Sequence, residues 1–237
     1  MTRQRVHCIT DLVLFDIDGT LISAKGAGSQ ALARAIFSCY GVEAPMQQIL
    51  LDGKTDPMIV HEALALAGET HQFQGTLTND FLGAYGHHLG EALDQCQHYQ
   101  VLPGVSSLLA RLGQNATFLV GLATGNVAAG ARRKLEKGKL LHYFHFGGYG
   151  CDSESRTEIV LQAVKRGRKI LGDRFSGKSI VVGDTPSDIK HGRKAGARTV
   201  AVATGIFNFE QLRACGPNAI FHSLQKTDEV LQVLQRI

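Results

Sequence analysis

A short apolar run that ends in two acidic residues constrains this chain most. The stretch DLVLFDIDGTLIS (residues 11–23) carries four apolar residues, which lead into Asp16 and, two positions later, Asp18. Residues i and i+2 of a strand point to the same face, so we expect the two carboxylates to lie close together. Like charges at that spacing repel, and one carboxyl group would be driven toward its neutral form. The chain must therefore offset this repulsion or use it.

The composition is that of a globular protein with a core. The chain has 237 residues, 44% of them apolar and 19% charged, which allows one large domain or a medium domain with a smaller one. No apolar run approaches the ~18 residues of a membrane span, and the run near the N-terminus is too short for a signal peptide. We therefore expect a cytoplasmic protein. The five scattered cysteines form no CxxC pair, which favours reduced thiols over disulfides or zinc.

Two basic runs accompany a formal net charge of +4: RRKLEKGK (132–139) and KRGRK (165–169). Such runs are usually solvated helix faces, and that is the interpretation we favour for both. The alternative is an acidic partner such as nucleic acid, but no aromatic residues are interleaved with the charges as stacking platforms. We expect neither a nucleic-acid nor a membrane partner, and a monomer or a homodimer.

Strand-like and helix-like segments alternate over most of the chain. Apolar runs rich in β-branched residues occur at 11–18, 117–125, 143–150, 179–185 and 199–205, with a weaker one at 219–224. Helical patterns occur at 103–113, 127–137, 155–171, 186–195 and 225–236. Near-continuous apolar strands separated by helices predict an α/β fold, with a Rossmann-like, doubly wound parallel sheet. Ligands of such sheets bind beyond the carboxyl ends of the strands, where the strand order reverses.

One long segment interrupts this alternation. Residues 23–99 contain no clear strand run, and their pattern indicates helices near 26–40, 55–67 and 76–96. Because this insertion follows the carboxyl end of the first strand, we expect a helical cap domain (23–99) over the ligand edge of a core domain (1–22 and 100–237). Within the cap, the loop DGKTDP (52–57) offers Lys54 to a ligand, or leaves it exposed to solvent. Asp56, before Pro57, is a plausible helix N-cap.

Polar residues follow the strands at the points where they stop. The parallel topology would gather these positions at one sheet edge, where clustered carboxylate oxygens suit Mg²⁺. GDTPSD (183–188) also reads as a plain helix start with Thr185 as N-cap, and TGN (124–126) as a turn. The structural and functional readings can coexist, because a helix N-terminus is itself an anion site. The residues concerned are Asp16, Asp18, Thr124, Gly125, Asn126, Asp184 and Asp188.

Three of these motifs resemble those of a known superfamily. DIDGT (16–20), LATGN (122–126) and VVGDTPSD (181–188) are similar to the first, second and fourth motifs of the haloacid dehalogenase superfamily. The inserted helices resemble its helical cap of the first kind, and the whole chain resembles the phosphoglycolate-phosphatase type. The third motif usually supplies a lysine, whereas CDSESRTEIV (151–160) supplies Arg156. Lys169, in the same predicted helix, would lie roughly 20 Å farther along.

The resemblance implies a Mg²⁺-dependent phosphatase that acts on a small phosphorylated metabolite through an aspartyl-phosphate. Asp16 would be the nucleophile and Asp18 the proton donor and acceptor, while Arg156 would balance charge. The metal would be held by Asp16, Asp184, Asp188 and the backbone carbonyl of Asp18. Thr124 and the residues that follow it would bind the phosphoryl oxygens. The substrate-binding set that we expect is Gly19, Thr20, Lys54, Gly125 and Asn126.

Two other functions remain open on the sequence. A phosphosugar mutase resembling the β-phosphoglucomutases would use the same core, with a cap that keeps water away. A catalytically silent binding module would share the fold, but it would have no need of every acidic residue named above. The dehalogenating enzymes of the superfamily that this chain resembles lack an aspartate at the position of Asp18. The presence of Asp18 therefore argues against a dehalogenase. The substrate is not readable: phosphoglycolate, sugar phosphates, nucleotides and pyrophosphate all remain possible.

Overall fold

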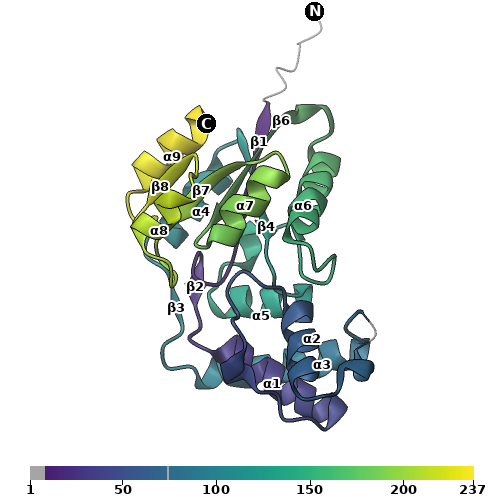
Figure 1. Ribbon diagram of the computed structural model, residues 1–237. Coiled ribbons are helices and arrows are strands. Elements are labelled where there is room, and N and C mark those ends of the chain that lie inside the picture. Colours follow the sequence, from purple (N-terminus) through teal and green to yellow (C-terminus); the bar gives the residue numbers. More distant parts are fainter. Residues whose placement is uncertain (1–8, 74) are drawn as a thin grey trace, which may run out of the picture.

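A six-stranded parallel sheet forms the centre of the protein (Figure 1). The computed structural model describes residues 9–73 and 75–237. The strand order is β5-β4-β1-β6-β7-β8, and every neighbouring pair is parallel. The predicted doubly wound α/β fold is therefore confirmed. The strands are β1 (Thr10–Phe15), β4 (Phe118–Ala123), β5 (Gly147–Gly148), β6 (Phe175–Gly183), β7 (Arg198–Val202) and β8 (Ala219–Phe221).

Both faces of the sheet are buried, which explains the unbroken apolar run at the start of the chain. Successive strand residues point to opposite faces. Leu12 and Leu14 contribute to one apolar cluster, and Val13 and Phe15 to another. The first cluster contains residues of α6 (Arg156–Leu171), and α7 (Pro186–Lys194) packs beside α6. The second contains residues of α4 (Val105–Gln114) and α9 (Thr227–Arg236).

The strand order reverses around β1. From β1 the chain continues to β4 and β5 on one side, and then to β6, β7 and β8 on the other. The carboxyl ends of β1, β4 and β6 are therefore neighbours at the point where such sheets bind ligands. This edge is the one that faces the helices of the insertion (Figure 1).

The insertion contains three long helices: α1 (Ala27–Tyr40), α2 (Asp56–Leu66) and α3 (Asn79–Gln95). Short 3₁₀ turns occur at Met46–Gln48 and Thr70–Gln72. An antiparallel ribbon of β2 (Ile22–Ser23) and β3 (Gln100–Val101) lies where the chain enters and leaves these helices. The helices agree with the expected ranges within a few residues, whereas the division into domains at 22/23 and 99/100 stays a prediction.

Some short elements were not predicted from the sequence. The β2–β3 ribbon has two residues in each strand, too few to produce an alternating pattern. Helix α8 (Phe209–Ala214) was not predicted either. The strand expected over 143–150 is reduced to Gly147–Gly148, and residues 141–143 form a 3₁₀ turn instead. The remaining helix, α5 (Ala128–Lys137), lies where it was expected.

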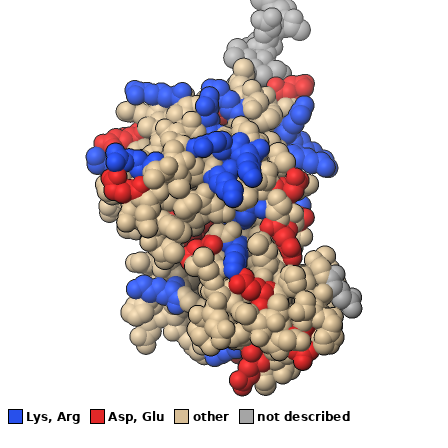
Figure 2. Space-filling model, viewed as in Figure 1, with Lys and Arg blue, Asp and Glu red and all other residues tan. Residues whose placement is uncertain are grey.

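Lys and Arg gather mainly on the α/β part of the face shown in Figure 2. In the run 165–169, Lys165, Arg168 and Lys169 are exposed, as expected of a solvated helix face. The absence of a nucleic-acid partner stays a prediction. Within the described ranges no helix is long and apolar enough to cross a membrane. Cysteines 39, 96, 151 and 215 are free thiols there, and Cys8 lies outside those ranges.

Candidate active site

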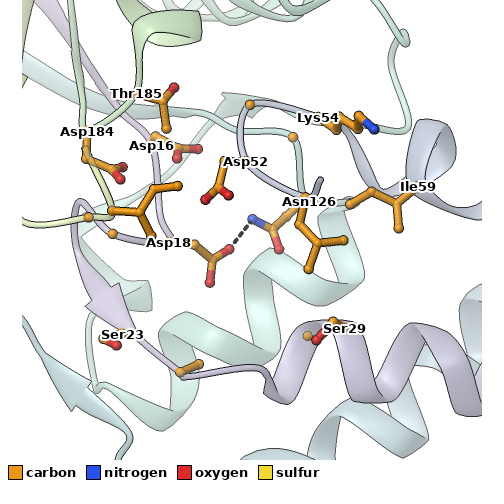
Figure 3. Close-up of a pocket in the computed structure, with 18 of the residues that line it drawn as sticks. Asp16, Asp18, Ser23, Ser29, Asp52, Lys54, Ile59, Asn126, Asp184 and Thr185 are labelled. Carbon is orange, nitrogen blue, oxygen red and sulfur yellow. Dashed lines mark hydrogen bonds between the residues drawn. The ribbon is translucent and has the colours of Figure 1, made fainter. Parts of the chain in front are cut away.

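Three buried carboxylates meet at the reversal point of the sheet. Asp16 follows β1, Asp184 follows β6, and Asp188 lies in the first turn of α7. One carboxylate oxygen of each lies within 4.8 Å of the others. Figure 3 shows the side chains of Asp16 and Asp184 facing each other across the strand ends. The sequence placed these three residues together, and the structure brings them together.

The electrostatics of this carboxylate cluster fit a cation. Burial, and then the charge of Asp188, raise the pKa of Asp16 to about 7. The same two causes raise the pKa of Asp184 well above its ordinary value. Oδ1 of Asp16 is buried and accepts no hydrogen bond, and such an atom is costly to bury without a partner. A hard divalent ion is the partner that three carboxylates suit best, so the residues present fit Mg²⁺.

Arg156 lies against the carboxylate cluster, as the sequence predicted. It is the first residue of α6, which is N-capped by Ser155. Its buried guanidinium donates a hydrogen bond to Asp188 and lies 3.8 Å from an oxygen of Asp16. Burial opposes its charged form, but the carboxylates of Asp188 and Asp16 raise the pKa of Arg156. The cluster thus keeps one fixed positive charge.

Asp188 combines the two roles that the sequence left open. Its Oδ2 accepts hydrogen bonds from the Thr185 hydroxyl (2.7 Å) and the Thr185 backbone N–H (3.1 Å), which closes a capping box at the start of α7. Its Oδ1 accepts from Arg156. One side chain therefore both closes the capping box of α7 and belongs to the carboxylate cluster.

Gly19 and Thr20 are held within the turn after β1, and a substrate contact by either residue stays a prediction. The Thr20 hydroxyl is buried and donates to Asp184 Oδ1 at 2.8 Å, so it holds a carboxylate of the cluster. The backbone N–H of Gly19 donates to Ile22 within the turn. Gly19, at φ +77°, also leaves room for Asp184, because a Cβ there would overlap the Asp184 carboxylate. A Cβ on Gly205, which the sequence analysis did not single out, would overlap it as well.

Asp18 points away from the carboxylate cluster. Strand β1 ends at Phe15, so the i, i+2 geometry of a strand does not apply to the two acids, and the shared face we expected is not formed. The Asp18 carboxylate lies outside the group of three and accepts a hydrogen bond from Asn126 Nδ2 at 2.8 Å (Figure 3). It also accepts one from Lys134 Nζ at 2.6 Å. The charge of Asp18 still helps to raise the pKa of Asp16, so the repulsion between the two acids persists and is offset by the pairing of Asp18 with Lys134.

Lys134 is the residue that the sequence analysis missed. We interpreted the run 132–139 as a solvated face, yet Lys134 is only 4% exposed and lines the cavity. A signal was present: Lys134 lies three residues after Ala131 and one before Leu135, on the buried face of α5. A buried lysine needs a partner for its charge, and here that partner is the partly exposed Asp18.

The loop after β4 connects the sheet to the insertion. The Thr124 hydroxyl is fully buried and accepts from the side chain of Asn126 at 2.9 Å. The carbonyl of Gly125 accepts from the Asp56 N–H at 2.9 Å, and the Val127 N–H donates to Asp56 Oδ2 at 2.8 Å. Asp56 is therefore not the N-cap of α2. That role belongs to Thr55, and Asp56 instead reaches across to the N-terminus of α5.

Lys54 lines the cavity, but its ammonium group is paired with Glu62 of α2. In Figure 3 its nitrogen points away from Asp16 and Asp184. A direct substrate contact by Lys54 stays a prediction, and it would require the pair with Glu62 to open.

A cavity of about 460 Å³ separates the carboxylate cluster from the insertion. This volume suits a small ligand. Gly125, Asn126, Arg156 and Asp184 line it on the sheet side. The insertion contributes small, polar and aliphatic residues, among them Ser23, Lys25, Ser29, Leu32, Leu51 and Ile59.

The parallel sheet, with a carboxylate cluster at its reversal point and helices over that point, is an α/β fold with a candidate catalytic site. Comparison with known proteins gives the family. The chain belongs to the haloacid dehalogenase-like hydrolase family, which residues 13–202 match. The resemblance carried by the three motifs is thereby confirmed, and the protein is a hydrolase.

Similar proteins extend over nearly the whole chain. A phosphoglycolate phosphatase of Vibrio parahaemolyticus is 23% identical over 98% of this chain and 99% of its own length. The Dickeya dadantii protein named "Probable phosphatase IndB" is 29% identical over 88% of each chain. A β-phosphoglucomutase structure from Clostridium difficile has a TM-score of 0.68 at 17% identity, covering 96% of this chain and 98% of that one. At that identity the structural likeness speaks for the fold alone.

Proposed function

We propose that this protein is a Mg²⁺-dependent phosphatase that hydrolyses a small phosphorylated metabolite through an aspartyl-phosphate on Asp16. The observation that carries the proposal is the buried Oδ1 of Asp16, which accepts no hydrogen bond and lies among two further carboxylates and one arginine. Both sequence relatives are named as phosphatases, which supports phosphate esters as the substrate class.

The proposed reaction has two steps. First, a carboxylate oxygen of Asp16 bonds to phosphorus as the ester P–O bond breaks, and Asp18 gives a proton to the departing oxygen, which leaves as the alcohol. Second, Asp18 takes a proton from water, whose oxygen bonds to phosphorus as the Asp16–phosphorus bond breaks. Inorganic phosphate leaves, and both carboxylates return to their starting state.

Asp16, Asp184 and Asp188 would hold Mg²⁺, which would neutralise part of the negative charge of the carboxylates and the phosphoryl group. Arg156 adds a fixed positive charge beside Asp16, where charge develops on the phosphoryl oxygens. Thr20 keeps Asp184 oriented through its hydroxyl. Thr124, Gly125 and Asn126 shape the loop against which the phosphoryl group would lie.

The helices of residues 27–95 would close the site from water. They contribute one wall of the cavity, so they would also contact the leaving group. This assignment gives the insertion the role of a specificity cap, and it is consistent with a small substrate.

Turnover of p-nitrophenyl phosphate with Mg²⁺ tests the proposal, followed by kcat/KM across a panel of phosphorylated metabolites. We expect activity that EDTA removes and Mg²⁺ restores, and none in the Asp16→Asn variant. Activity in that variant equal to the wild type would refute Asp16 as the nucleophile. Isomerisation of a sugar phosphate without release of inorganic phosphate would instead favour a mutase. Absence of any turnover would favour a silent binding module.

A further inference from the structure

Three side chains form a closed hydrogen-bonded triangle beside the carboxylate cluster. Lys134 Nζ donates to Asp18 Oδ2 at 2.6 Å and to Asn126 Oδ1 at 2.7 Å. Asn126 Nδ2 in turn donates to the same Asp18 Oδ2 at 2.8 Å. The three residues come from the end of β1, the end of β4 and the second turn of α5. Two sides of the triangle have ordinary hydrogen-bond lengths, and the shortest, between Lys134 and Asp18, joins two charged groups.

The two donors hold a single oxygen of Asp18. Both bonds go to Oδ2, so a proton on this carboxyl group can reside only on Oδ1. Asp18 is partly exposed and lines the cavity, and without these partners its side chain could rotate. A proton donor acts efficiently only when it lies within hydrogen-bond reach of the oxygen that accepts the proton. The triangle therefore determines which oxygen carries the proton.

Residues of the insertion and of its return segment hold Lys134 in place. The backbone carbonyl of Lys134 accepts from the Tyr99 hydroxyl at 2.7 Å, just before β3. Asp56 of α2 binds the N–H of Val127 at the start of the same helix. Gly28 of α1 leaves room for the ammonium group, since a Cβ there would lie 3.2 Å from Lys134 Nζ. A buried lysine that is enclosed in this way cannot belong to a solvated face.

We propose that Lys134 is a positioning residue for Asp18. It fixes the Asp18 carboxyl group so that Oδ1 presents its proton to the leaving-group oxygen. This inference rests on the proposed phosphatase function. It adds a residue that lies outside the three motifs recognised in the sequence.

A lysine that positions Asp18 affects esters differently according to their leaving group, which a merely structural lysine would not do. Alkyl phosphates expel a strongly basic oxygen, which needs the proton from Asp18, whereas p-nitrophenyl phosphate expels a weakly basic one that scarcely does. Loss of general-acid assistance costs about 10²–10⁴-fold where it is needed. A poorly positioned Asp18 should therefore slow alkyl esters much more than the aryl ester.

The experiment compares kcat/KM for p-nitrophenyl phosphate and for the best alkyl phosphate in wild type and Lys134→Met. We expect the ratio of aryl to alkyl kcat/KM to rise by about tenfold or more. Because both substrates are measured on one preparation, the ratio does not depend on the folded fraction of the variant. The matched control is Lys137→Met, since Lys137 lies on the same helix and pairs with Asp94 at the surface. There the ratio should not change.

A second measurement separates positioning from damage to the helix. In Lys134→Ala, a small alkylammonium ion added to the assay should restore the alkyl-ester rate in proportion to its concentration, and the aryl rate much less. Equal losses for both esters in Lys134→Met, or no loss, would overturn the role of Lys134 while leaving the phosphatase function intact. A wild-type protein inactive on both esters would instead overturn the function on which the inference depends.

Discussion

The guanidinium of Arg156 lies between two buried carboxylates: it is hydrogen-bonded to Asp188 and lies 3.8 Å from Asp16. No lysine of α6 takes this position, since Lys165 and Lys169 are exposed and line a separate surface hollow. Arginine stays charged at every working pH, and its planar group can bind two oxygens at once. The first turn of α6 thus places the positive charge of Arg156 beside Asp16 and Asp188. The motif DIDGT (16–20) has no cationic residue of its own.

Replacement of Arg156 tests this arrangement. Arg156→Met leaves Asp188 buried without its charged partner, and breaking a buried pair in this way typically costs about 3–5 kcal/mol. We expect a lower melting temperature and loss of turnover. Arg156→Lys should retain the fold better, because it retains the charge. Calorimetry and steady-state kinetics measure both effects, and a fully active Arg156→Met variant would contradict the role of this cation.

Stability without metal should fall as the pH rises. The pKa of Asp16 is raised from 3.8 to about 7 by burial and by Asp188, so the folded state binds this proton more tightly than the unfolded chain does. Its contribution is fully present below about pH 4 and is lost as the pH rises through about 7. Mg²⁺ binds the ionised carboxylates, so it should stabilise the protein more at about pH 8 than at pH 5.

Melting temperatures with EDTA and with Mg²⁺ at the two pH values measure this linkage. The control is Asp184→Asn, which removes one of the three carboxylates and should abolish most of the Mg²⁺ effect. A Mg²⁺ stabilisation that is independent of pH would contradict the assigned cluster.

The contact of the loop 52–56 with the loop after β4 depends on a glycine. A Cβ on Gly125 would overlap the carbonyl oxygen of Lys54 and approach Arg156 to 2.8 Å. We therefore expect Gly125→Ala to displace the 52–56 loop, to raise KM and to lower kcat. Gly86→Ala is the matched control, because nothing lies within 4 Å of a Cβ at that position in α3. It should stabilise the helix by up to about 1 kcal/mol with unchanged kinetics.

We expect Asp56 to stabilise the folded protein through its contact with the loop after β4. Asp56→Ala leaves the Val127 N–H without the acceptor it has in the structure, a loss of about 1–3 kcal/mol. Asp56→Asn retains an acceptor oxygen and should cost less. Burial raises the pKa of Asp56 to about 6. The contribution of this group to the stability of the wild-type protein therefore falls as the pH rises from about 4 to 6. Urea unfolding at several pH values distinguishes the three proteins, and identical curves would exclude the contact.

Much of this protein could be predicted from local sequence patterns. The run from Leu12 to Phe15 is apolar at every position because both faces of its strand are buried, and the parallel sheet followed from several such runs. Asp16, Asp184 and Asp188 could be grouped because parallel strands bring their carboxyl ends to one edge. The position of Arg156 could be predicted because the helix that contains it begins at that edge, so its first residues lie beside the acids.

What the sequence determined was therefore the order of elements and the residues that end them, since both depend on neighbours along the chain. The tertiary structure alone decided how side chains pair across elements. In the folded protein Asp18 points away from Asp16, and the Thr20 hydroxyl donates a hydrogen bond to Asp184. Lys134, which lies in a run that looked exposed, is buried and binds Asp18. Such pairings depend on where the chain turns after β1 and on how α5 packs against α3. The helical spacing indicated that Lys134 is buried, but a partner more than a hundred residues away leaves no local pattern.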